Sequence, residues 1–121
     1  IEVERTIYAD AEVSLSDCNF ELISFIERMQ PFGPGNHEPV LLLRGLTVLP
    51  FSRIVGDGHM KLRVEDSAGL QVEMIGFSLA RHWNINEIIG SKLDFLCHLR
   101  RNQYMGREEA QLQIVEMRFS E

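Results

Sequence analysis

The chain has 121 residues and a mass of 13.9 kDa, the size of one domain or of one domain with a short appendage. Its hydrophobic content of 45% and charged content of 25% are ordinary for a globular protein. The sequence has no run of about 18 apolar residues, which excludes a membrane-spanning helix, and no secretory leader is visible. The chain begins with Ile1 rather than Met, which suggests a piece of a larger protein.

The net charge of -6 argues against a general nucleic-acid binder, but the charge is unevenly spread. Residues 1–39 carry eight acids and two bases, whereas residues 40–121 carry ten of each. Five bases and two acids lie between Arg81 and Arg107, which fits either a modest positive face or an ordinary mixed surface. The chain has only two cysteines, which do not suggest a disulfide framework, and a reducing cytoplasm is the expected location.

The first predicted elements are a short strand with a connection over residues 1–15 and then a helix. Asn19 is the expected cap of this helix, and Pro31 ends it, because a residue before proline is driven out of the α region. One apolar stripe recurs at the helical period and consists of Leu22, Phe25, Ile26 and Met29.

The hexapeptide PFGPGN, residues 31–36, follows the helix. Its glycines lack the Lys-Ser/Thr of a phosphate-binding P-loop, and they follow a helix where a P-loop precedes one. We favour a rigid exit from the helix, in which prolines restrict the backbone and glycines allow it to reverse. A phosphate cradle is the alternative.

Strand-like runs come next. Residues 40–49 predict a long strand that bends at Gly45, because glycine inside a strand often marks a bulge. Residues 59–65 and 70–77 alternate on either side of a turn and predict a hairpin, with Met60, Leu62 and Val64 on one side of its first strand.

A short helical or irregular connection is expected over residues 78–90. Strands follow over residues 93–99 and 112–119, joined by the polar segment 100–111. This order predicts a mainly β fold: a five-stranded OB-fold barrel preceded by an N-terminal strand and helix. A small antiparallel sandwich is the alternative architecture.

Groups that could carry catalysis are scattered. The four histidines, His37, His59, His82 and His98, show no metal-ligand spacing with cysteines or acids. Cys97 and His98 are neighbours in a predicted strand, where they point to opposite faces and cannot act as nucleophile and base. We therefore expect no enzymatic activity, metal or cofactor in this chain alone.

Four blocks carry a resemblance to a known family, and Tyr8–Glu12 adds to them. The blocks are Pro31–Asn36 with Glu38-Pro39, Val55–Leu62, Ile75–Phe77, and Asn102–Arg107 leading to Gln111-Leu112. In this order the chain resembles the RecJ-type single-strand-specific DNA exonucleases, in the part that follows their catalytic core. The resemblance implies that residues 1–37 are a helical lead-in and connector from that core, and that residues 38–121 are an OB-fold domain.

The resemblance also implies a function. In the family, a two-lobed core binds Mn²⁺ or Mg²⁺ and removes nucleotides from a 5′ end, while an OB domain grips the single strand. This chain has none of the aspartate–histidine metal motifs, so it is expected to be a DNA-binding accessory domain in DNA repair and recombination, with the metal in the absent core. The expected partners are single-stranded DNA, the core of the same polypeptide, and other replication or repair proteins, but no membrane.

Single-strand binding requires a positive groove and flat side chains on which bases stack. His59, Lys61 and Arg63 share one face of their predicted strand, although an ordinary solvated face is the alternative. A loop at the barrel mouth is expected to present further groups, with Tyr104 standing where relatives often place a tryptophan. The predicted DNA-binding residues are Arg53, His59, Lys61, Arg63, Arg100, Arg101, Asn102, Tyr104 and Arg107.

Two further aromatic residues, Phe77 and Trp83, could also stack on bases, but both border apolar runs, so core packing is the favoured prediction for both. A second hypothesis is that the barrel is a protein–protein docking module of the same enzyme with little direct DNA contact. The acidic first third of the chain suits contact with a basic protein surface and would repel DNA.

Overall fold

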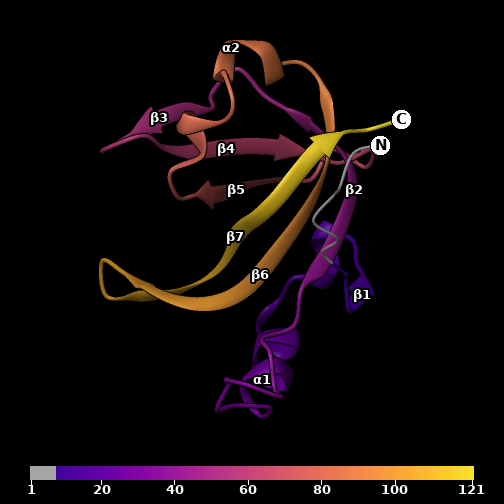
Figure 1. The fold of residues 1–121 in the computed structure, drawn as a ribbon, viewed down its shortest axis with the longest axis vertical. Coiled ribbons are helices and arrows are strands. Elements are labelled where there is room, and N and C mark those ends of the chain that lie inside the picture. The colour runs from indigo at the N-terminus through magenta and orange to yellow at the C-terminus, as the bar shows by residue number, and fades with distance from the viewer. Residues whose placement is uncertain (1–7) are drawn as a thin grey trace.

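The computed structural model describes residues 8–121, so the start of the predicted first strand lies outside the described residues (Figure 1). The described chain begins with β1 (Ala11–Glu12), the 3-10 turn η1 (Leu15–Asp17) and helix α1 (Phe20–Glu27). The strands β2 (Leu41–Val48), β3 (Arg53–Val55), β4 (His59–Glu65) and β5 (Gln71–Gly76) follow. The short helices η2 (Leu79–Arg81) and α2 (Ile85–Ile88) then lead to the long strands β6 (Lys92–Tyr104) and β7 (Arg107–Phe119).

Helix α1 begins as predicted. The side-chain oxygen of Asn19 accepts a hydrogen bond from the backbone N–H of Leu22 at 2.9 Å. The predicted apolar stripe is wrong in part, because the helix buries Ile23 and Ile26 and leaves Phe25 and Met29 exposed. The buried face therefore runs through Ile23 and Ile26, of which only Ile26 belongs to the predicted stripe.

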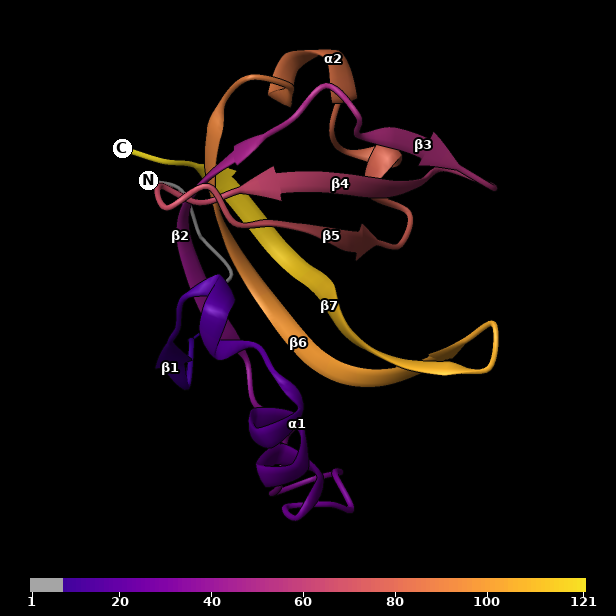
Figure 2. The same ribbon diagram turned by 180° about the vertical axis from the view of Figure 1, so that it is seen from behind.

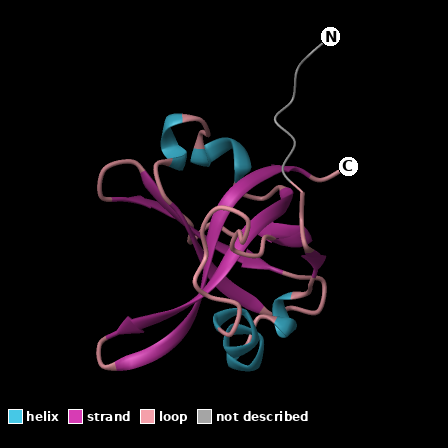
Figure 3. Cartoon of the chain, turned by 60° about the horizontal axis from the view of Figure 1, so that its bottom comes forward, coloured by secondary structure: helices cyan, strands magenta, loops and turns pink. Residues whose placement is uncertain are grey.

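The mainly β prediction is confirmed. The strands form one seven-stranded sheet in the order β1-β2-β6-β7-β5-β4-β3. An additional pairing of β2 with β4, at Thr47–Glu65 and Val48–Val64, curls the sheet into a partial ring, as Figure 2 shows from behind. β1 lies within residues 1–15, where a short N-terminal strand was predicted in addition to the five barrel strands. The short β3 was not predicted, because it carries no apolar alternation long enough to reveal it. Helices α1 and α2 lie at opposite ends of the sheet (Figures 1 and 3).

The predicted bend at Gly45 is present. Its φ is +68°, and the register of β2 against β6 shifts between Leu43 and Leu46. A left-handed backbone is open to glycine at little cost, so Gly45 supplies the irregularity that turns the strand.

The polar segment 100–111 is a β-ribbon, not the predicted loop. β6 continues to Tyr104 and β7 begins at Arg107, with Met105 and Gly106 at positive φ in the turn between them. Figures 1 and 2 show this two-stranded extension projecting beyond the rest of the sheet. We call residues 100–111 the ribbon.

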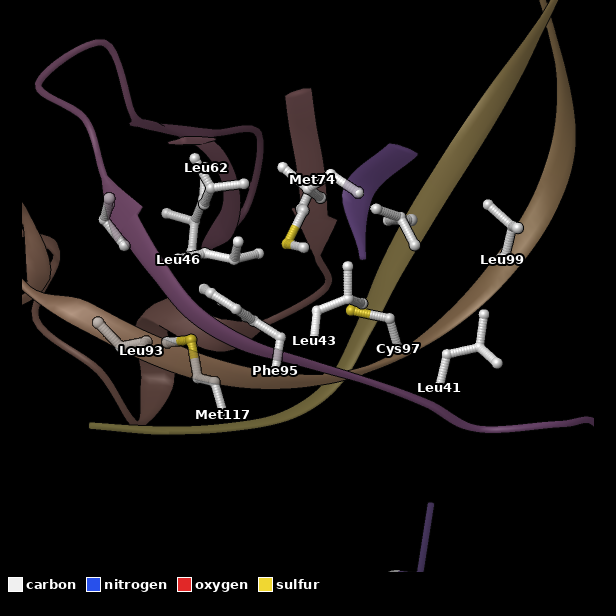
Figure 4. Packing of buried hydrophobic residues seen from close by; sticks show 14 of the residues in the cluster. Leu41, Leu43, Leu46, Leu62, Met74, Leu93, Phe95, Cys97, Leu99 and Met117 are labelled. Carbon is white, nitrogen blue, oxygen red and sulfur yellow. The ribbon is translucent and has the colours of Figure 1, made fainter. Parts of the chain in front are cut away.

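One hydrophobic core joins the sheet and the lead-in segment. Met60, Leu62 and Val64 are fully buried on the side predicted for them. Leucines of β2 and alternate residues of β6, including Phe95 and Cys97, pack against them (Figure 4). Ile23 of α1 belongs to the same cluster, so the helix closes one end of the core.

Candidate nucleic-acid interface

A groove of about 630 Å³ lies between the strands β3, β4 and β5 and the ribbon. β5 and β7 pair only at Met74–Leu112 and Ile75–Gln113, and the earlier part of β7 departs from β5 to leave this space. The groove is lined by Arg53, Lys61, Arg63, Val72, Glu73, Met74, Ile75, Phe77, Asn102, Tyr104, Glu109, Ala110 and Gln111.

Three of the predicted cations, Arg53, Lys61 and Arg63, line the groove, and they differ in whether a carboxylate pairs with them. Arg53 donates to Glu73 at 3.0 Å, so its charge is matched by a carboxylate in the same groove. Among residues 8–121, no carboxylate lies within ion-pair distance of Lys61 or Arg63. These two side chains therefore carry the positive charge of the groove that no ion pair compensates. Glu109 of the ribbon lines the same groove and contributes a negative charge.

Two aromatic rings also line the groove. Tyr104 is 51% exposed near the ribbon tip, as its predicted stacking role requires. Phe77 is 56% exposed, so the core packing predicted for it is wrong. It follows the end of β5 on the side away from the core, and the apolar run that suggested burial ends at Gly76. Trp83, by contrast, packs partly buried against the core as predicted.

His59 is not among the residues that line the groove. Its Nδ1 accepts a hydrogen bond from the backbone N–H of Ser78 at 2.9 Å, and its ring meets Phe77 edge to face at 5.4 Å between centroids. Ser78 has a positive φ of 59°, so the histidine stabilises an unusual turn. His59 thus orients Phe77, a role that the sequence did not reveal.

Arg100 lies on the ribbon but points to the connector that follows the hexapeptide. Its Nε and Nη2 donate to the two carboxylate oxygens of Glu38 at 2.8 and 2.6 Å, and its Nη1 donates to Gln113. Glu38 is only 15% exposed, and the hydrogen bonds from Arg100 hold the pKa of its carboxyl below the ordinary value, against the effect of burial. The free cation predicted at Arg100 is therefore corrected to a bidentate ion pair.

Arg101 points to the other face of the ribbon, toward α1. Its guanidinium donates to both carboxylate oxygens of Glu27 at 3.1 Å and to Glu108 at 3.0 Å, and it lies over the ring of Phe20. Neighbouring residues of a strand point to opposite faces, which separates Arg101 from Asn102 and Tyr104. The predicted grouping of these side chains at one loop is therefore wrong.

The remaining two predicted DNA-binding residues, Asn102 and Arg107, differ in their position relative to the groove. Asn102 lines the groove opposite Lys61 and Arg63. Arg107 pairs with Tyr104 across the ribbon and is exposed, but it is not part of the groove lining.

The hexapeptide forms a tight turn. Gly33 and Asn36 exchange two backbone hydrogen bonds, and the Asn36 side chain donates to the carbonyls of Met29 and Pro31. The side-chain amide thus ties the turn to the end of the helix, the arrangement expected of a rigid exit.

Groups suited to metal binding or nucleophilic catalysis remain apart. Among residues 8–121, no three His, Cys, Asp or Glu side chains gather into a possible metal site. Burial raises the pKa of the Cys18 thiol to about 11 and also raises that of Cys97, so neither is a thiolate near neutral pH. His98 Nδ1 lies 3.0 Å from the carbonyl oxygen of Pro39 and fixes the connector to β6.

The sequence matches the family profile of the RecJ OB domain over residues 9–116. The chain belongs to the RecJ OB domain family. A comparison with curated proteins finds no match.

Several solved structures have a similar fold. RecJ from Thermus thermophilus in complex with Mn²⁺ has a TM-score of 0.58 and 24% identity, covering 84% of this chain and 14% of that one. The Thermus thermophilus RecJ complex with Mg²⁺ has a TM-score of 0.55 and 22% identity, and the match covers 84% of this chain and 15% of that one. A putative aspartyl-tRNA synthetase from Leishmania major Friedlin has a TM-score of 0.58 and 11% identity, and the match covers 97% of this chain and 22% of that one. At these identities the likeness shows the fold.

The metal of the RecJ structures has no counterpart among the residues described here. The acids nearest to histidines, Asp10 with His37 and Glu38 with His98, form isolated pairs, and a stable site for Mn²⁺ or Mg²⁺ needs more oxygen ligands. The described residues therefore do not fit the ion. None of the helices within residues 8–121 is long and apolar enough to span a membrane.

Proposed function

We propose that this RecJ OB domain binds single-stranded DNA in the groove as the accessory domain of a RecJ-type 5′-3′ exonuclease. One observation supports this most directly. Lys61 and Arg63, which are free of ion pairs among residues 8–121, share the groove with the half-exposed rings of Phe77 and Tyr104. Cations that follow a backbone and rings that stack on bases are the two requirements of single-strand binding.

The expected energetics follow from these groups. Each base that stacks on an aromatic ring contributes about 1–3 kcal/mol to the binding free energy, and this contribution depends little on the DNA sequence. Each phosphate neutralised by a cation releases a counterion, so affinity falls as salt rises. With two free cations in the groove and a net charge of -6, we expect weak binding by the isolated domain. Attachment to a catalytic core would raise the effective DNA concentration and so the processivity of the enzyme.

We also infer that five strands work together as an OB barrel. The pairings of β2 with β4, β4 with β5, β5 with β7, β7 with β6 and β6 with β2 return to their starting strand. The division into a lead-in and connector, residues 1–37, and an OB-fold domain, residues 38–121, belongs to the same proposal. So do a cytoplasmic location, a role in DNA repair and recombination, and a Mn²⁺- or Mg²⁺-dependent hydrolase core elsewhere in the polypeptide.

The proposal is tested by titrating a labelled thymidine oligonucleotide at a series of salt concentrations and following anisotropy. The double variant Lys61→Gln/Arg63→Gln should bind more weakly, and the slope of log K against log salt should become less steep by about 1.4. Arg81→Gln/Lys92→Gln is the matched control, because it removes two exposed positive charges outside the groove. Absent binding by the wild type at low salt, or equal losses in both variants, would contradict the proposal.

Docking to another protein is the alternative function, and one observation favours it. Phe25 of α1 and Met29, which follows the helix, are exposed and line a mostly apolar hollow of about 400 Å³ with Leu22 and Pro39. Replacing Phe25 and Met29 with serine should abolish capture of a separately expressed RecJ catalytic core if docking is the main role. Under our proposal the same variant retains oligonucleotide binding.

A further inference from the structure

The ribbon extends beyond the strands that flank it. β2 pairs with β6 only as far as Cys97, and β5 pairs with β7 only at Leu112 and Gln113. Residues 100–111 therefore have strand partners only in each other. A two-stranded ribbon alone is marginally stable in water, so its position depends on side-chain contacts.

Those contacts come from α1 and from Glu38, which lies shortly before β2. Glu27 of α1 receives two hydrogen bonds from Arg101, and Ser24 of the same helix receives a third at 3.2 Å. Glu38 receives two more from Arg100. The planar guanidinium fits a carboxylate in one orientation, so these bidentate pairs fix the direction of the ribbon as well as its distance.

The ribbon is also one wall of the groove. Asn102, Tyr104, Glu109, Ala110 and Gln111 line it, while Lys61 and Arg63 stand on the opposite wall. A change in the ribbon angle would change the distance between the stacking ring of Tyr104 and these cations.

We propose that Arg100 and Arg101 are positioning residues, whose ion pairs with Glu38 and Glu27 hold the ribbon at the angle that gives the groove its width. The inference rests on the proposed function for its consequence, DNA affinity, but the position of the ribbon is a property of the protein alone. It replaces direct phosphate contact as the role of these two arginines.

The test uses the opposite charges of Arg101 and Glu27. A phosphate-binding Arg101 predicts that Arg101→Gln weakens DNA binding and that Glu27→Gln, which removes a negative charge, strengthens it. A positioning pair predicts that both variants weaken binding, by about twofold to fivefold, and that the double variant is no weaker than either single variant. The salt slope should stay within about 0.3 of wild type, whereas loss of one phosphate contact on single-stranded DNA would make it less steep by about 0.7.

Amide hydrogen exchange of residues 100–111 provides a readout that needs no DNA. Both variants should exchange about threefold faster across the ribbon than wild type. Glu21→Gln is the matched control, because it removes the same charge from an exposed position of α1 and should leave the exchange unchanged. Unchanged ribbon exchange in Arg101→Gln and Glu27→Gln, or opposite effects of the two variants on affinity, would overturn the proposal. Faster exchange in a protein that binds no oligonucleotide would support the positioning role and contradict the proposed function.

Discussion

The backbone N–H of Gly45 donates a hydrogen bond to Oδ1 of Asp94 at 2.9 Å, across the boundary between β2 and β6. Asp94 is 6% exposed and also accepts from Ser120 and Arg118. Burial alone would raise the pKa of Asp94, but these three donors together hold it below its ordinary value. The carboxylate thus satisfies the N–H that the irregular backbone at Gly45 leaves without a ladder partner.

Replacing Asp94 with alanine should destabilise the fold. The change leaves the N–H of Gly45 and the hydroxyl of Ser120 without their acceptor, and it should lower the free energy of unfolding by about 1–3 kcal/mol. Urea denaturation followed by fluorescence measures this loss. Asp57→Ala removes an exposed carboxylate from a turn and serves as control; equal midpoints for the two variants would contradict the role of Asp94.

Stability should fall in acid because of Glu38 and Asp94. Both carboxyls have a lowered pKa in the folded protein, so each contributes stability that is complete above its ordinary value, 4.5 for Glu38 and 3.8 for Asp94. This contribution is lost as the pH falls below those values toward the folded pKa. The urea midpoint of the wild type should decline over that window, and the decline should be shallower in Glu38→Gln. Parallel pH profiles would show that the Arg100–Glu38 pair does not contribute.

Removing the ring of Tyr104 should weaken DNA binding while removing its hydroxyl should not. Tyr104→Ala is expected to lose about 1–3 kcal/mol of binding free energy, and Tyr104→Phe should stay within about twofold of wild type, because stacking needs only the ring. Met105→Ala is the control, since its exposed side chain lies at the ribbon tip outside the groove. A loss in Tyr104→Phe as large as in Tyr104→Ala would point to the hydroxyl instead.

Gly76 cannot accept a side chain without movement of its neighbour. A Cβ at this position would overlap the side chain of Leu79, so Gly76→Ala should lower the free energy of unfolding by about 1–3 kcal/mol. The second change Leu79→Ala should make the alanine at position 76 nearly neutral. Gly33→Ala, where an added Cβ meets nothing within 4 Å, should cost less than half as much. Thermal denaturation compares the wild type, Gly76→Ala, Leu79→Ala, the double variant and Gly33→Ala.

Local patterns predicted the elements whose signal lies in neighbouring residues. The capped helix follows from Asn19, the hairpin of β4 and β5 from the alternation around Asp66, and the bend from Gly45. The ribbon was not predicted as two strands, because polar residues and a glycine suggest a loop. The residues on either side of the Met105-Gly106 turn nevertheless pair with one another, from Tyr104 with Arg107 to Arg100 with Gln111. A polar alternation around a two-residue turn was the signal available for it.

The charge pairing of the ribbon had no local signal. Arg101 meets Glu27 across 74 positions of sequence, and Arg100 meets Glu38 across 62. The packing of α1 against β6 brings Glu27 to Arg101, and the pairing of β2 with β6 at Leu41–Cys97 brings Glu38 toward Arg100. The faces of β7 were equally hidden, because the register shift against Leu96 and Cys97 leaves Val115 unpaired and lets Met117 and Leu112 both point inward.

The sparse β2–β4 and β5–β7 pairings also bear on how the chain folds. The hairpins β4–β5 and β6–β7 join neighbours in sequence, whereas Met74 of β5 pairs with Leu112 of β7 across the intervening η2, α2 and β6. Contacts between distant parts of a chain are slow to form because the loop between them loses entropy first. We therefore expect closure at Leu112 to follow the transition state, so that Leu112→Ala accelerates unfolding and hardly alters the refolding rate in stopped-flow measurements.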